Sequence, residues 1–153
     1  MKALTLEVKP LKGFGELTFG MTVEQVKEYL GEPDETETLD DLDDEETLIY
    51  HYDNYDISAF FEGEGEEKFL VNVETGNSDA TLYGKSVFAM NEQEIIKLMK
   101  ENKFVEMDDE ELEDEEHQNE RRVSFDEAMM DFFFEDEILI ALSWGNFFYD
   151  EKD

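Results

Sequence analysis

Cysteine is absent from this 153-residue chain. That absence excludes disulfides, thiolate metal sites, thiol nucleophiles and a lipid anchor attached to cysteine. No apolar run reaches the length needed to span a membrane. The first residues meet charge at Glu7 and Lys9, before the apolar core of a signal peptide could form. We therefore expect a soluble, cytoplasmic protein.

Basic residues are also scarce, because 12 Lys and Arg stand against 44 Asp and Glu, for a net charge of −32. A field of this sign repels nucleic acid and anionic membranes, and it raises the association rate of basic partners and cations. It also destabilises the compact state through self-repulsion. The 40% of apolar residues still provide for a folded core, so the charge does not indicate disorder. The acidic surface of a halophilic protein is an alternative reason for this composition.

The chain contains an internal repeat, in which corresponding positions differ by a constant sequence offset (84 − 15 = 69). Three pairs of segments share this repeat offset: 15–22 with 84–91, 69–71 with 138–140, and 76–77 with 145–146. Repeat one spans about residues 11–78 and repeat two about residues 80–149. Each repeat is too short to bury a core alone, so we expect a single domain, residues 1–153, in which the repeats share a core or one sheet.

Each repeat is predicted to begin with a helix. Thr22–Gln25 and Asn91–Glu94 have capping-box patterns, and the helices are expected to reach about Leu30 and Asn102. Gly31 ends the first helix. Strand-like runs follow at 48–52, 56–62 and 68–74, then at 122–125, 129–134 and 138–144, and residues 4–8 add a further strand. The pattern predicts an α+β fold of two tandem repeats, each a helix plus an antiparallel meander, with the helices on one face of the sheet.

The last strand of each repeat indicates which side of the sheet the helices cover. Alternation places two apolar sets on the covered side: Phe69, Val71 and Val73, and then Ile138, Ile140 and Leu142. The other side carries a mixed set: Leu70, Asn72, Glu74, Leu139, Ala141 and Ser143. A mixed side leaves room for a binding surface.

The entry and exit of the first helix resemble a known fold. The residues that carry the resemblance are Phe19-Gly20-Met21-Thr22, Val26 and Leu30-Gly31-Glu32-Pro33, with a degraded second copy at Phe88-Ala89-Met90-Asn91, Ile95 and Met99. The pattern is similar to the β-lactamase-inhibitor-protein fold, whose relatives include small outer-membrane assembly lipoproteins. The resemblance implies helices on one face of a curved sheet and an open, aromatic-lined concave face that docks a partner protein. We expect no export signal of the kind that family carries, the chain has no cysteine, and nothing in it matches a β-lactamase-binding loop.

Two acidic segments occupy the same place in both repeats. Residues 32–46 and 106–120 each hold ten acidic residues and no Lys or Arg. We expect them to be anionic arms that engage a basic protein, through Asp40, Asp41, Asp43, Asp44, Asp108, Asp109, Glu110 and Glu111. Solvated loops are the plainer alternative for such blocks of like charge. A calcium site is a third reading, but neither segment has the glycine of an EF-hand loop.

Aromatic residues cluster on the strands expected near the end of the chain. Phe132-Phe133-Phe134 is a strand run, so alternation sends at least one ring to the open side of the sheet. Phe133 and Trp144 are the candidates for exposed anchors of a partner. Core filling or a dimer contact is the alternative use of such residues.

Catalytic patterns are weak in this sequence. His51 and His117 form no H-x-x-x-H or H-E-x-x-H pair, and carboxylates are too abundant to mark a glycosidase site. We therefore expect no catalytic residues, no metal site and no cofactor. The leading hypothesis is a non-catalytic acidic module that binds a basic protein, as an inhibitor or immunity-type protein that blocks a target such as a nuclease. The alternative is a structural or cargo-binding module whose acidity only secures solubility, and an enzyme ranks third.

Overall fold

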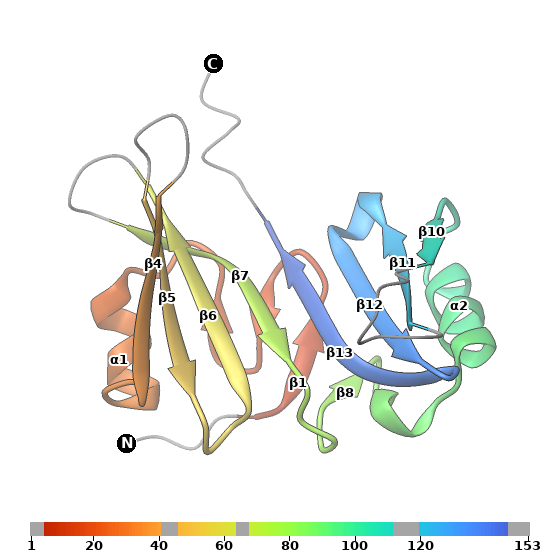
Figure 1. The fold of residues 1–153 in the computed structure, drawn as a ribbon, viewed down its shortest axis with the longest axis horizontal. Helices are drawn as coiled ribbons and strands as arrows, with labels where there is room; N and C mark the ends of the chain where they lie inside the picture. The colour runs from red at the N-terminus through yellow and green to blue at the C-terminus, as the bar shows by residue number, and fades with distance from the viewer. Residues whose placement is uncertain (1–4, 41–45, 64–67, 112–119, 147–153) are drawn as a thin grey trace.

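The computed structural model describes residues 5–40, 46–63, 68–111 and 120–146. Its largest element is an eight-stranded sheet in the order β10-β11-β12-β13-β7-β6-β5-β4, with every neighbouring pair antiparallel. The strands are β4 (Glu35–Asp40), β5 (Glu46–Tyr52), β6 (Ile57–Glu62), β7 (Phe69–Thr75), β10 (Asp108–Glu111), β11 (Glu120–Phe125), β12 (Met130–Glu135) and β13 (Ile138–Gly145). Figure 1 shows β7 and β13 side by side in the middle, with β4 and β10 at the two edges.

A second, smaller sheet has five short strands in the order β3-β2-β1-β8-β9. They are β1 (Glu7–Lys9), β2 (Gly13–Phe14), β3 (Leu17–Thr18), β8 (Thr81–Leu82) and β9 (Lys85–Ser86). The β1–β8 pair is parallel, and it joins the segment before the first helix to the segment before the second. The other pairs are antiparallel.

Two α-helices and two 3-10 turns complete the described structure: α1 (Val23–Leu30), α2 (Glu92–Glu101), η1 (Val87–Ala89) and η2 (Asp126–Ala128). Both predicted capping boxes are confirmed. The Thr22 side chain accepts from the Gln25 backbone N–H, and the Asn91 side chain accepts from the Glu94 backbone N–H. Each box satisfies two backbone donors that a helix start leaves without partners. No helix in these ranges is long and apolar enough to cross a membrane.

The predicted α+β class is wrong. Strands make up 50% of the structure and helices 20%, and the strands form two sheets, one of eight strands and one of five. In the small sheet, β1 overlaps the strand expected at residues 4–8, but the other four strands escaped prediction because runs of two residues are too short to show alternation. Part of each acidic segment expected as a loop is also a strand, namely β4 and β10.

One face of the large sheet, here called the inner face, packs against the rest of the molecule. The Tyr52 hydroxyl on β5 donates to the Gly31 carbonyl at the end of α1, over 3.0 Å. Near β11, the Arg121 Nε lies 3.5 Å from Glu92 Oε1 at the start of α2. Between the helices, the Trp144 indole N–H donates to the Gly13 carbonyl of the small sheet, over 2.8 Å. The helices and the small sheet thus lie on the same side, over a core centred on β6, β7, β12 and β13.

The repeat offset reappears in the central strand pairing. β7 and β13 pair through Val73↔Trp144, Glu74↔Ser143 and Thr75↔Leu142. Subtracting 69 from the second member of each pair gives 75, 74 and 73. The pairing is therefore symmetric about Glu74 and Ser143, as a local pseudo-two-fold axis through this pair requires.

The same offset relates two β-bulges. The pairing shifts by one residue between Phe60 and Phe61 on β6, and between Phe133 and Phe134 on β12. These shifts leave Val71 of β7 and Ile140 of β13, which correspond in the repeat, without a cross-strand partner on that side. A bulge inserts one residue into one strand, so the alternation of side chains is interrupted there.

The bulges explain why the predicted inner residues are partly wrong. Val73 and Leu142, after the bulges, do face the core. Before the bulges the faces are exchanged, so that Leu139 is buried while Ile138 is 62% exposed and Ile140 is 40% exposed. On β7 the exchange likewise buries Leu70.

Candidate protein-binding face

The opposite side of the eight-stranded sheet, here called the outer face, carries a mixture of aromatic, acidic and small polar side chains. Strand pairing places nine of them at its centre: Ser58, Phe60, Glu62, Asn72, Glu74, Asp131, Phe133, Ala141 and Ser143. All nine are partly exposed. Both α-helices lie on the inner face, so this side is the one available to a partner.

Two hollows flank the Glu74–Ser143 pair. The first, here called hollow A, has a volume of about 380 Å³, and Phe60, Asn72, Asp131 and Ser143 lie in its wall. The second, hollow B, has a volume of about 280 Å³, and its wall contains Ser58, Glu74, Ile140 and Ala141. The pseudo-two-fold axis relates them, because Asn72 corresponds to Ala141 and Glu74 to Ser143 in the repeat.

Carboxylates line both hollows. In hollow A, Asp131 Oδ1 accepts from the Ser124 hydroxyl over 2.5 Å, and Glu62 Oε2 accepts from the Thr47 hydroxyl over 3.1 Å. In hollow B, burial raises the pKa of Glu74, the nearby charge of Asp56 raises it further, and His51 opposes the shift. Of the described residues, no Lys or Arg lines either hollow. Both hollows therefore present carboxylates beside apolar walls.

A row of three polar side chains crosses the outer face beside hollow B. His51 Nδ1 lies 2.8 Å from the Ser58 hydroxyl, and His51 Nε2 lies 3.0 Å from Glu37 Oε1. The order Ser–His–Glu resembles a nucleophile with its base and orienting acid. Acyl transfer also needs donors for an oxyanion, yet Ser58 sits in a strand paired on both sides and its neighbour in hollow B is the carboxylate of Glu74. The row is better understood as a polar link between β4, β5 and β6.

The acidic segments are placed at the edges of the sheet. Asp40 is the last residue of β4, while Asp41, Asp43 and Asp44 lie outside the described residues. The other four predicted residues form the whole of β10, Asp108–Glu111, and all four are exposed. Charge on an edge strand discourages pairing with the edge of another sheet. Asp40 and the four residues of β10 therefore lie at the two opposite edges of the large sheet.

Two arginines neutralise part of β10. Arg121 forms an ion pair with Asp109, and Arg122 forms one with Glu110. The sequence prediction missed them because both arginines follow the acidic segment immediately, and antiparallel pairing of β10 with β11 brings them opposite. Glu110 lies directly opposite Arg122, whereas Asp109 lies opposite Val123 and therefore reaches Arg121 diagonally.

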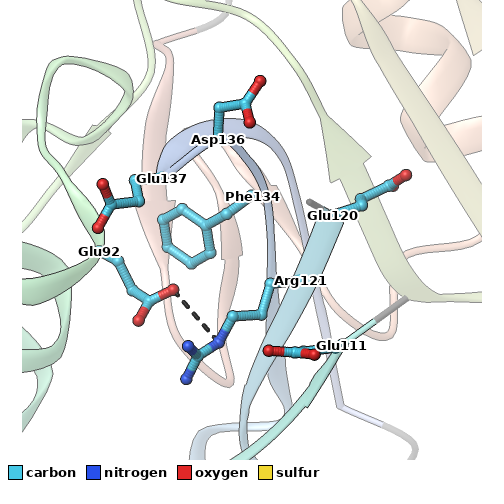
Figure 2. Close-up of a pocket in the computed structure, with 7 residues that line it drawn as sticks. All are labelled: Glu92, Glu111, Glu120, Arg121, Phe134, Asp136 and Glu137. Atoms are coloured by element: carbon cyan, nitrogen blue, oxygen red, sulfur yellow. Dashed lines mark ion pairs between the residues drawn. The ribbon is translucent and has the colours of Figure 1, made fainter. Parts of the chain in front are cut away.

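A third hollow surrounds Arg121 and has a volume of about 390 Å³. Figure 2 shows the guanidinium between the carboxylates of Glu92 and Glu111, with Phe134 beside it, while the Glu120 side chain points away from it. The residues Asp136 and Glu137 complete its acidic wall. Since the hollow already contains its own cation, we assign it to joining α2 with β11 and not to a ligand.

The two predicted aromatic anchors lie on opposite faces of the large sheet. Phe133 lies on the outer face and is partly exposed. Trp144 is wrong as an exposed anchor, because it is fully buried on the inner face and packs edge-to-face on Phe14 at 5.1 Å between ring centroids. Phe60, which the prediction did not single out, is the ring that corresponds to Phe133 on the other side of the axis.

A protein-family model supports one statement about relationship. The family described as a domain of unknown function (DUF7738) matches residues 15–122, which is more than half of the chain. The chain belongs to the DUF7738 family. No curated protein and no solved structure matches it.

In this DUF7738 protein the outer face extends beyond the family match. The matched residues contain β4 to β7 and end within β11, whereas β12 and β13 follow them. Hollow A draws on both parts, with Phe60 and Asn72 inside the match and Asp131 and Ser143 beyond it. Within the described ranges of the DUF7738 chain, no group of three or more His, Asp or Glu side chains is placed to hold a metal ion.

Proposed function

We propose that this protein is a non-catalytic binding module that docks a basic protein on the outer face of its eight-stranded sheet. Its most concrete form is an inhibitor or immunity-type protein that blocks a basic target such as a nuclease, acting in the cytoplasm. The main support for this proposal is that two partly exposed rings, Phe60 and Phe133, and two carboxylate-lined hollows occur together on one open face of the sheet. Aromatic anchors beside polar groups are typical of interaction hot spots.

The charge distribution supports a basic partner. The net charge of −32 attracts a cationic protein over long range and repels nucleic acid and anionic membranes. The edge strands β4 and β10 add exposed acids at both edges of the large sheet, among them Glu35, Glu37, Asp108 and Glu111. Long-range charge speeds encounter, whereas a desolvated ring slows release. The sequence resemblance to the β-lactamase-inhibitor-protein fold also implies docking on the face opposite the helices.

One observation favours a second candidate, a structural or cargo-binding module whose acidity only secures solubility. The ion pairs of Asp109 and Glu110 with arginines neutralise part of the second acidic segment within the protein. Such a module would need no charge attraction between its edge strands and a partner.

Binding kinetics with a captured partner separate the two candidates. The tagged wild-type protein is used to isolate its partner, and the purified partner is then tested for association and release by surface plasmon resonance. Neutralising Glu35, Glu37, Asp108 and Glu111 to amides should lower the association rate roughly tenfold and change release little. Phe133→Ala should instead raise the release rate, by roughly tenfold for an anchor worth ~1.4 kcal/mol.

The control is Val105→Ala, which shortens an exposed apolar side chain that lies after α2 and outside the outer face. It should leave both rates unchanged. Equal association rates for the wild-type and charge-neutralised proteins would favour the solubility reading. An unchanged release rate for Phe133→Ala would remove the outer face as the docking site.

A further inference from the structure

We propose that hollows A and B each take one cationic side chain, Lys or Arg, from the same extended segment of the partner, at positions i and i+2. This inference deepens the proposed function and rests on it, since it names the chemistry that the outer face recognises. It adds two specific subsites to a face that would otherwise attract any cation.

Hollow A has the composition that a long basic side chain requires. The ring of Phe60 and the side chain of Met129, which is 37% exposed, provide apolar wall. Asp131, Asp126 and Glu62 place carboxylates around it. Lys and Arg bury their methylene stems along apolar surface and keep the charged head at a polar site, and a cation beside an aromatic face gains further attraction. The hollow therefore suits the stem and the head of the same side chain.

Hollow B repeats this arrangement on the other side of the axis. Ile140 and Ala141 provide the apolar wall, and Glu74 and Asp56 provide the carboxylates. Burial raises the pKa of Glu74, which shows that its charged form is poorly solvated in the isolated protein. A cation of the partner in this hollow would add to the compensation that His51 gives Glu74, because an opposite charge nearby favours the ionised carboxyl.

The spacing of the hollows sets the spacing of the two cations. The wall of hollow A contains Phe60 and Asn72, and the wall of hollow B contains Ser58 and Glu74, which lie two residues further along the same strands. Two residues of a strand span ~7 Å. In an extended segment, side chains at i and i+2 point to the same side and are also ~7 Å apart, whereas neighbouring side chains point to opposite sides. An extended segment above β7 and β13 can therefore fill both hollows with basic residues two positions apart.

Two isomeric peptides test the spacing. The probes are acetyl-Thr-Lys-Thr-Lys-Thr-amide and acetyl-Thr-Lys-Lys-Thr-Thr-amide, which share composition and charge and are too short to form stable helices. Their affinities are measured by NMR titration of the full-length protein at ~0.3 M salt, where attraction between distant charges is screened. The spaced peptide should bind roughly tenfold more tightly, the factor that ~1.4 kcal/mol from the second subsite supplies. Equal affinities for the two peptides would overturn the inference.

Single-charge variants assign the effect to the hollows. Glu74→Gln and Asp131→Asn should each weaken the spaced peptide severalfold and remove its preference over the adjacent one. Glu101→Gln is the matched control, because it removes the same charge from the exposed end of α2 on the inner-face side. An equal loss of affinity in Glu101→Gln would show that only net charge matters, and the inference would fail.

Failure of this inference and failure of the proposed function are distinguishable. If the peptides show no preference while Phe133→Ala still speeds release of the captured partner, the docking face stands and the two subsites do not. If the peptides behave as expected while Phe133→Ala and the charge variants leave the partner's kinetics unchanged, the hollows bind cations but the partner docks elsewhere.

Discussion

Replacing Trp144 with Phe tests how the two sheets are joined. The substitution removes the buried indole N–H that donates to the Gly13 carbonyl over 2.8 Å, at the contact between β13 and the small sheet. Removing a buried donor while its acceptor stays buried without a hydrogen bond costs about 1–3 kcal/mol. The smaller ring also leaves a void against Phe14, which adds roughly 1–2 kcal/mol. We expect a total of roughly 2–5 kcal/mol, a large part of the ~5–15 kcal/mol that stabilises a typical domain.

Urea unfolding followed by far-UV circular dichroism measures this cost. Circular dichroism is used because Trp144 is the only tryptophan, so its replacement removes the tryptophan fluorescence that would otherwise report unfolding. The matched control is Phe133→Leu, which alters a partly exposed ring on the outer face and should cost less than about 1 kcal/mol. If Trp144→Phe is no more destabilising than Phe133→Leu, with unchanged dependence on urea, then the indole does not join the two sheets as described.

Three further predictions concern charge and backbone. Raising salt from low concentration to ~0.5 M should raise the melting temperature, because screening weakens self-repulsion in a chain of net charge −32, and a flat response would mean that this repulsion does not strain the fold. Gly84→Ala should lower the free energy of unfolding by about 1–2 kcal/mol, because the φ of Gly84 is +78° and its surroundings are open. Gly15→Ala should lower it by roughly 1–3 kcal/mol more, because the added Cβ would lie 1.9 Å from the Thr5 carbonyl oxygen. Urea unfolding measures both costs, and equal costs would contradict the described turn. Burial raises the pKa of Glu74 above its ordinary 4.5, so the stability linked to this carboxyl is complete below that value and is lost as pH rises through the raised pKa. Glu74→Gln should therefore raise the melting temperature at about pH 7 but not at about pH 4, and an increase of the same size at both values would refute this explanation.

Local signals in the sequence predicted local structure well. Thr22 and Asn91 cap the two helices as expected, because a capping box is complete within four residues. The repeat offset also marks real correspondences, since the bridges Thr22↔Phe69 and Asn91↔Ile138 differ by the same offset at both ends (91 − 22 = 138 − 69). These features depend on neighbouring residues or on direct comparison of two segments, and both are visible in a linear sequence.

Features that depend on distant pairing were not predictable. The bulges at Val71 and Ile140 reverse the alternation of inner and outer side chains, and no nearby residue pattern indicates the extra position in the strand. The burial of Trp144 follows from its register after the bulge. The mainly β class escaped prediction because the small sheet joins short segments that lie far apart in the chain, such as Val8 and Leu82.

The candidate site was only partly predictable for the same reason. The sequence indicated Phe133 through a run of three aromatic residues. Phe60 is its counterpart on the other side of the pseudo-two-fold axis, and only the pairing of Phe60 with Asn72 reveals this. The hollows combine β6, β7, β12 and β13, so no single segment of the sequence contains them. Arg121 and Arg122 lie just beyond the acidic segment that they partly neutralise, and only the antiparallel pairing of β10 with β11 reveals this.

The central claim is that the outer face is the docking site. Amide NMR shift mapping of the isotope-labelled protein, with and without the captured partner, tests it most directly. We expect the largest changes on the central strands β6, β7, β12 and β13, at Phe60, Asn72, Glu74, Asp131 and Ser143, with α1 and α2 little affected. Changes concentrated on the helices or the small sheet, with the outer-face amides unmoved, would contradict the account.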